Sequence, residues 1–125
     1  MRQYNDIGHF RLALLGYVLL GVTRVWALQP MPIMTAVGCV DNADRGEFLV
    51  VAATMPLPLE ERMPEAPRPD VPLGDLTIRL VGTLEEFGVA DYAGHKVWVK
   101  GLLNSSEPHD LLNLTSITSL SSTCK

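Results

Sequence analysis

The sequence has 125 residues, enough for one domain and too few for two. It contains 10 Lys and Arg against 14 Asp and Glu, a formal net charge of -4, and 47% of its residues are apolar while 6% are aromatic. These values exclude a multidomain enzyme, a coiled coil and a polytopic membrane protein. The acidic balance also argues against a basic nucleic-acid-binding module, because such modules contact phosphates through an excess of Lys and Arg.

The N-terminal segment predicts a signal peptide. Residues 1–11 are polar, and residues 12–22 (LALLGYVLLGV) form an uncharged apolar run. A helix of that length is about 16 Å long, roughly half the hydrocarbon thickness of a bilayer, so it is too short to span one. Residues 25–27 then resemble a signal-peptidase site. We therefore expect cleavage after Ala27 and no stable membrane span; the alternative is a buried core helix or an uncleaved anchor.

The two cysteines predict a disulfide. After cleavage the chain would carry seven Lys and Arg against thirteen Asp and Glu, a formal charge of -6, with Cys39 near its start and Cys124 near its end. In an oxidising compartment such a pair is most simply one bridge between the first and last strands, contributing about 4.5 kcal/mol. The alternative is two free thiols in a cytosolic protein. We do not expect lipoprotein anchoring at Cys39, because it lies well beyond the apolar run.

Residues 28–33 form a lead-in, and residues 34–125 predict one all-β domain with minor α content. Thr83 and Glu86 have the spacing of a capping box, which predicts a short helix or helical turn within residues 83–92. Five segments have the apolar or alternating patterns of strands: residues 33–40, 47–53, 76–82, 95–102 and 111–120.

A proline-rich loop separates the second and third of these strands. Residues 55–75 contain prolines at 56, 58, 64, 67, 69 and 72. Prolines at this density cannot join a sheet ladder, so the segment is either a functional loop or a disordered one. We expect a mobile loop, because its charged residues offer little to bury.

The order of these elements predicts the fold. Five strands with a short helix between the third and fourth is the chain order of the OB-fold, a small Greek-key barrel. We therefore expect a five-stranded OB-like barrel with one disulfide. The alternative is an open antiparallel sheet or a small sandwich.

Several short motifs carry a resemblance over residues 35–125. They are Val37-Gly38-Cys39, Leu80-Val81-Gly82, the run GHKVWVKG over residues 94–101, and a Ser/Thr-rich last strand ending in Cys124. In these the chain resembles a group of small exported bacterial OB-like domains. The resemblance implies export, a disulfide and an OB-like barrel, and it brings no established activity. The proline-rich insertion departs from the shorter connection typical of that group.

The sequence contains no pattern that indicates catalysis. His95 and His109 do not have the spacing of zinc ligands, and we expect His95 to bond a neighbouring backbone group. Asp41, Asp44 and Glu47 could surround a calcium ion, but their spacing is not that of an EF-hand and a solvated turn is favoured. We therefore expect no enzyme, no metal site and no cofactor.

One surface strip suggests ligand binding. Arg79 on the third strand and Lys96, Trp98 and Lys100 on the fourth share the outward parity, which places three cations around one aromatic ring. Such a strip could stack a nucleobase or a sugar ring. The alternative is that the lysine stems cover Trp98 on the outside of the barrel.

These patterns predict an exported, periplasmic or extracellular binding module. Its partner would be a small polar ligand, a glycan or an envelope protein. One alternative is a cytosolic domain that binds single-stranded nucleic acid through the Trp98 strip, with residues 12–22 as core, although the acidic charge disfavours it. Another is a purely structural module with no ligand.

Overall fold

The computed structural model describes residues 31–60, 62 and 64–124. The chain divides into two units, Met1–Met31 and Pro32–Lys125, and the fold given below is that of the second. The expected signal peptide, its cleavage position at Ala27 and residues 28–30 of the lead-in lie outside the described residues. Within the residues described, no helix combines the length and the hydropathy that a membrane span requires.

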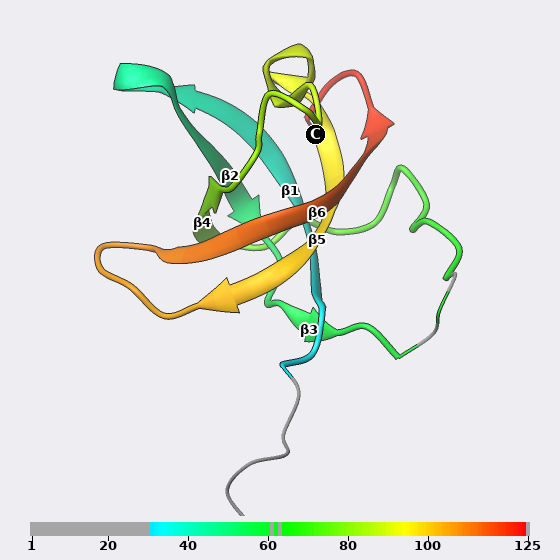
Figure 1. Cartoon of the computed structure of the whole chain (residues 1–125). Helices are drawn as coiled ribbons and strands as arrows, with labels where there is room; N and C mark the ends of the chain where they lie inside the picture. The colour runs from blue at the N-terminus through cyan, green and yellow to red at the C-terminus, as the bar shows by residue number, and fades with distance from the viewer. Residues whose placement is uncertain (1–30, 61, 63, 125) are drawn as a thin grey trace, which may run out of the picture. The chain divides into compact units, whose positions relative to one another are not determined.

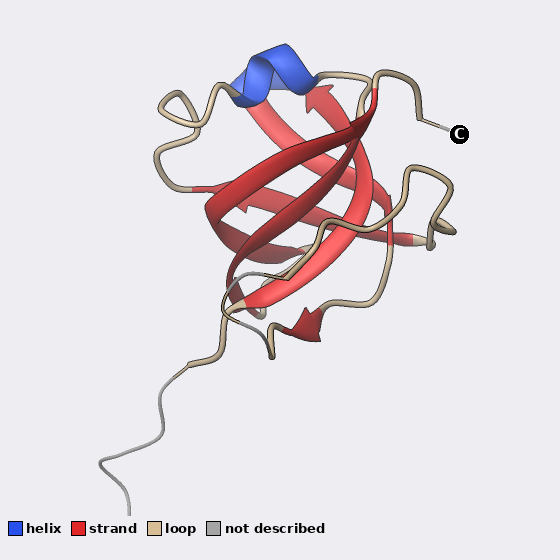
Figure 2. Cartoon of the chain, turned by 90° about the vertical axis from the view of Figure 1, so that its right-hand side faces the viewer, coloured by secondary structure: helices blue, strands red, loops and turns tan. Residues whose placement is uncertain are grey.

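Strands make up most of the regular secondary structure of the described residues (Figure 2). All five expected strands are confirmed to within a few residues, and a two-residue strand is added between the second and third. The expected helical turn is a series of turns that ends in a short 3-10 helix. In chain order the elements are β1 (Met34–Ala43), η1 (Asp44–Gly46), β2 (Glu47–Ala53), β3 (Leu57–Pro58), β4 (Leu76–Val81), η2 (Val89–Tyr92), β5 (Lys96–Asn104) and β6 (Asp110–Ser121).

The strands close into a barrel (Figure 1). β1 pairs with β5 through its first half and with β2 through its second half, so it joins the two ends of the sheet. β2 then pairs with β4, β4 with β6 in parallel, and β6 with β5. The closed order β1-β2-β4-β6-β5 confirms the expected OB-like barrel, and the open sheet is excluded. The short strand β3 adds to the edge of β1 outside the barrel.

Gly38 lies where β1 passes from one partner to the other. A Cβ at this position would lie 2.9 Å from the carbonyl oxygen of Val51 and 3.1 Å from the Cα of Ala53. Both distances are shorter than side chains normally accept. The crossing of β1 over β2 therefore depends on a residue without a side chain.

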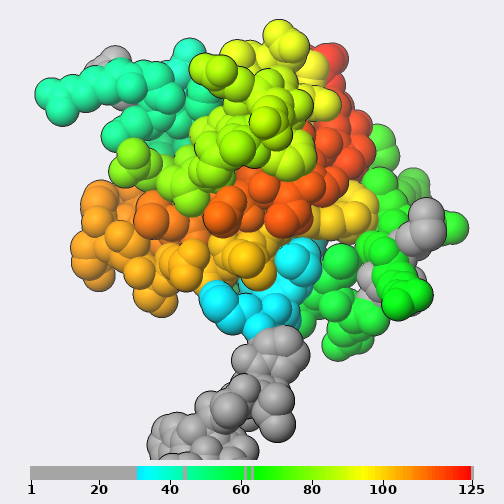
Figure 3. All heavy atoms as spheres, viewed as in Figure 1, coloured from blue at the N-terminus to red at the C-terminus, as the bar shows by residue number. Residues whose placement is uncertain are grey.

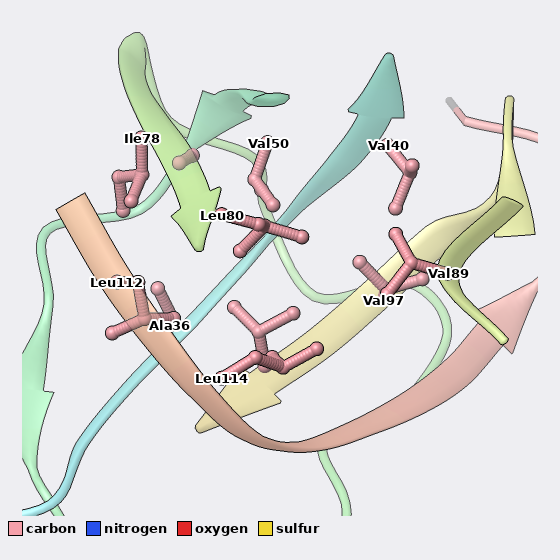
Figure 4. Close-up of a cluster of buried hydrophobic side chains, with 11 residues drawn as sticks. Ala36, Val40, Val50, Ile78, Leu80, Val89, Val97, Leu112 and Leu114 are labelled. Atoms are coloured by element: carbon pink, nitrogen blue, oxygen red, sulfur yellow. The ribbon is translucent and has the colours of Figure 1, made fainter. Parts of the chain in front are cut away.

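The interior is filled by one face of each long strand (Figure 4). On β5 the alternation is as expected: Val97 and Val99 point inward, while Lys96, Trp98 and Lys100 lie on the outside. Aliphatic side chains fill the barrel with little aromatic help. The buried cluster consists of Ala36, Val40, Val50, Ala53, Ile78, Leu80, Val89, Val97, Val99, Leu112 and Leu114.

The expected disulfide is confirmed. Cys39 of β1 is bonded to Cys124, three residues beyond the end of β6, with their Cα atoms 5.8 Å apart. Cys39 lies opposite Lys96 in the β1–β5 ladder, and β5 separates β1 from β6. The bridge therefore crosses the start of β5 and fastens the end of the last strand to the first.

The described residues of the proline-rich segment are hydrogen-bonded to the barrel at several points, contacts that its composition does not predict. We call the described residues of this segment, 55–60, 62 and 64–75, the proline strap; Figure 3 shows their green atoms against the side of the barrel. Leu57 of β3 pairs with Thr35, and the N–H of Leu59 donates to the carbonyl of Ile33 at 2.8 Å. At the far end the N–H of Gly74 donates to the carbonyl of Ala52 at 2.9 Å. Prolines have no N–H, but the residues between them supply these bonds.

Candidate functional site

A row of three outward side chains crosses β2, β4 and β6. The strand register places Leu49 opposite Arg79, and Arg79 opposite Leu111. Directly opposed residues point to the same side of a sheet, so the guanidinium of Arg79 emerges between two half-buried leucines. The outer face of these three strands therefore combines a cation with apolar flanks.

Glu47 supplies the opposite charge on the same face. Nη2 of Arg79 lies 3.2 Å from Oε1 of Glu47, and the two side chains are 44% and 40% exposed. An ion pair at this exposure is weak, about 0.2–1 kcal/mol, because water screens it. The polar groups of a ligand can therefore replace this ion pair at little cost in free energy.

The connection between β5 and β6 forms a wall beside this row. Residues 106–109 of the connection border a hollow of about 220 Å³ together with Glu47, Leu49, Arg79 and Leu111. The N–H of Ser106 lies 3.4 Å from Oδ1 of Asp110, which holds the connection near the start of β6. We call this hollow the Arg79 groove.

The Arg79 groove contains both hydrogen-bond donors and hydrogen-bond acceptors. Arg79 presents N–H donors, Glu47 presents carboxylate oxygens, and Ser106 and His109 can each donate or accept. Leu49, Leu111 and Pro108 provide the apolar surface. A site of this kind can orient a polar ligand by several hydrogen bonds while its less polar face contacts the leucines.

The four residues of the expected strip do not lie together. Lys96, Trp98 and Lys100 share the outer face of β5, as the alternation predicts. Arg79 lies on β4, and β6 runs between β4 and β5, so Arg79 belongs to the groove instead. The combined strip is therefore two separate surfaces.

The β5 part of the strip is covered. Lys96 is 1% exposed and Trp98 7%, although both point away from the barrel interior. Nζ of Lys96 donates to the carbonyl oxygen of Pro69 at 2.9 Å and to that of Val71, so its ammonium is bonded to the proline strap. Nζ of Lys100 lies 4.1 Å from the centre of the Trp98 ring, a cation–π contact consistent with the covering of Trp98 by lysine stems.

The histidines and carboxylates form no metal centre in the part of the chain that the structure describes, where no group of three or more His, Cys, Asp or Glu could hold an ion. Nδ1 of His95 lies 3.0 Å from Oγ of Ser119, so its ring bonds a side chain rather than the expected backbone group. The ring of Tyr92 meets that of His95 edge to face at 5.9 Å. His95 therefore has a packing role at the start of β5.

Sequence reasoning missed most of the Arg79 groove. Glu47, Leu49 and Leu111 lie at outward positions of their strands, which alternation could have indicated. Their proximity to Arg79 depends on β4 being paired with both β2 and β6. The position of residues 106–109 just before the last strand is the one sequence feature that indicates a role in ligand binding. Loops at the mouth of a barrel often border its ligand-binding face.

Comparison of the chain with protein-family models, curated proteins and solved structures finds no match.

Proposed function

We propose that this chain is an exported, non-catalytic binding module that takes a small polar ligand, such as one unit of a glycan, in the Arg79 groove. The observation that carries the proposal is the row Leu49–Arg79–Leu111 with Glu47 paired to its centre. The groove lies on the barrel face formed by the second and third strands of the five-stranded barrel and beside the last connection. OB-folds generally bind ligands on this face.

The charges of the groove favour an uncharged, hydroxyl-rich ligand. Glu47 and Glu107 place two carboxylates around the single guanidinium of Arg79, so a polyanion would be repelled. A hydroxyl group can accept from Arg79 and donate to Glu47 at the same time. At about 220 Å³ the hollow is below the 300–1,000 Å³ typical of drug-sized ligands, which suits one small ring.

The disulfide supports export. Disulfides persist in oxidising compartments and are rare in the cytosol. The Cys39–Cys124 bridge, together with the apolar run of residues 12–22, therefore favours a periplasmic or extracellular location.

Mass measurement tests the export. The intact mass of the native protein, taken before and after reduction with thiol alkylation, should correspond to a chain beginning at Leu28 that is alkylated only after reduction. A mass beginning at Met1 with two freely alkylated thiols would overturn this part of the proposal.

The alternative of a single-strand nucleic-acid binder has less support. Binding without sequence preference relies on exposed aromatic rings and a basic channel. Trp98, the aromatic of the expected strip, is 7% exposed, and the groove around Arg79 carries more acidic than basic groups. The Arg79 groove therefore fits the glycan class better.

Amide NMR spectra of the isotope-labelled chain test the ligand class. A panel of neutral oligosaccharides should shift the signals of Arg79, His109 and Leu111, while an oligothymidylate should not. Arg79→Gln should weaken sugar binding about tenfold or more, because hydrogen bonds to a charged group contribute about 1.5–3 kcal/mol.

Arg68→Gln is the matched control. Arg68 is also an exposed arginine with a carboxylate partner, Asp70 at 3.4 Å, but it lies on the proline strap. Its variant should bind like the wild type. Equal loss in both variants, or binding of the oligothymidylate alone, would contradict the proposal.

A further inference from the structure

Arg79 lies where an apolar row and a polar line cross. The row consists of Leu49, Arg79 and Leu111, which the strand register places side by side. Glu47 lies two residues before Leu49, His109 lies two residues before Leu111, and both border the Arg79 groove. Because β2 runs antiparallel to β4 and β6 runs parallel to it, Glu47 and His109 lie on opposite sides of the row. A ligand in the groove therefore meets polar groups along one line and leucines on either side of it.

The polar line presents a donor and an acceptor next to each other. Nη2 of Arg79 lies 3.2 Å from Oε1 of Glu47, and the two side chains are 44% and 40% exposed, so both can face one ligand. A guanidinium only donates hydrogen bonds, and an ionised carboxylate only accepts them. A ligand that bonds both groups must therefore bring an acceptor and a donor that are neighbours.

Charged ligand groups match only half of this pair. A carboxylate brings acceptors for Arg79 and places a like charge against Glu47, whereas an ammonium brings donors for Glu47 and places a like charge against Arg79. Two adjacent hydroxyls of a sugar ring match both halves, because one accepts from the guanidinium while the other donates to the carboxylate. A single hydroxyl would have to reach both atoms at a narrow angle, which weakens its hydrogen bonds.

We propose that the Arg79 groove recognises sugars through two adjacent hydroxyl groups, one bonded to Arg79 and the next bonded to Glu47; this recognition rests on the function proposed above. The C–H surface of the ring beside these hydroxyls packs on Leu49 and Leu111. Glu47 is then a specificity-determining residue, because it bonds the second hydroxyl and disfavours acidic sugars. Without Glu47 the guanidinium would favour a carboxylate, with which it forms paired hydrogen bonds.

Matched sugars test this recognition in amide NMR titrations of the full chain. The probes are the methyl glycosides of glucose, galactose and mannose, their analogues that lack one ring hydroxyl, and the corresponding uronic acid glycosides. At least one neutral glycoside should shift the signals of Arg79 and Leu111. Removing either of two adjacent hydroxyls from that sugar should weaken binding about tenfold, because a hydrogen bond to a charged group is lost. Its uronic acid form should also bind more weakly.

Glu47→Gln is the decisive variant. The amide keeps the size of the side chain, removes its charge and adds N–H donors. This variant should bind the neutral glycoside about fivefold more weakly and the uronic acid glycoside more tightly than the wild type does, so the order of preference should reverse. Glu85→Gln is the control: it removes the same charge from an exposed glutamate outside the groove, and it should keep the wild-type order.

The failures of the two proposals are distinguishable. If neither the methyl glycosides nor the neutral oligosaccharides shift the signals of the groove, the proposed function fails. If the oligosaccharides shift them and none of the methyl glycosides does, recognition through adjacent hydroxyls alone is overturned. It is overturned as well if the bound sugar tolerates the loss of each hydroxyl in turn, or if Glu47→Gln keeps the preference for the neutral sugar.

Discussion

The barrel has two outer faces that look alike in sequence and differ in the folded chain. The face of β1 and β5 carries Lys96, Trp98 and Lys100, and the proline strap covers it. The face of β2, β4 and β6 carries Leu49, Arg79 and Leu111 and remains open as the Arg79 groove. Both arise from ordinary strand alternation. Whether an outer face of this barrel is exposed to solvent therefore depends on whether another segment of the chain bonds to it.

The covered face also holds the covalent bond, so the largest effect is expected there. Replacing both Cys39 and Cys124 by alanine should lower the free energy of unfolding by about 4 kcal/mol, because the open chain gains conformational entropy when unfolded. Urea denaturation without reducing agent measures this loss. The reduced wild type should behave like the double variant, and a loss below about 1 kcal/mol would contradict the expectation.

Removing the ammonium of Lys96, which lies on β5 and donates to the proline strap, should have the next largest effect. Lys96→Met keeps the apolar stem and leaves the carbonyls of Pro69 and Val71 without their donor. The free energy of unfolding should fall by about 1–3 kcal/mol, the usual cost of leaving a buried polar group unbonded. Urea denaturation measures the loss, and limited proteolysis should show faster cleavage within the strap.

The open face provides the counterpart to this variant. Arg79→Gln removes a cation whose described ion pair with Glu47 is exposed, so it should change the free energy of unfolding by at most about 0.5–1 kcal/mol. A larger loss in Arg79→Gln than in Lys96→Met would break the comparison, because it would make the Arg79 face the structural one.

Much of the barrel could be predicted from local patterns. The inward positions of Val97 and Val99, the bridge between Cys39 and Cys124, and the chain order of the five long strands all follow from alternation, spacing and composition. These features depend on residues close together in the sequence, or on the number and order of cysteines and strands. For that reason the fold was the most predictable part of the molecule.

The sites were less predictable, because they depend on contacts between distant segments. The parity of Lys96 was read correctly, but its burial comes from strap residues 27 and 25 positions away. Composition predicts a mobile strap, because the segment is rich in charge and proline. Its hydrogen bonds to Lys96 and to the backbone of Ile33 and Ala52 cannot be seen in composition. Arg79 was separated from Trp98 by the insertion of β6 between their strands.

The position of β6 has a consequence for how the barrel forms. β4 and β5 each have one neighbour besides β6, so both keep an open edge until β6 is in place. β6 is also the last of the described strands, and its parallel pairing with β4 joins residues about thirty positions apart. Such long-range pairing makes folding slow, in the range of milliseconds to seconds. Because Cys124 follows β6, its bond to Cys39 holds the strand that closes the barrel beside β1 and β5.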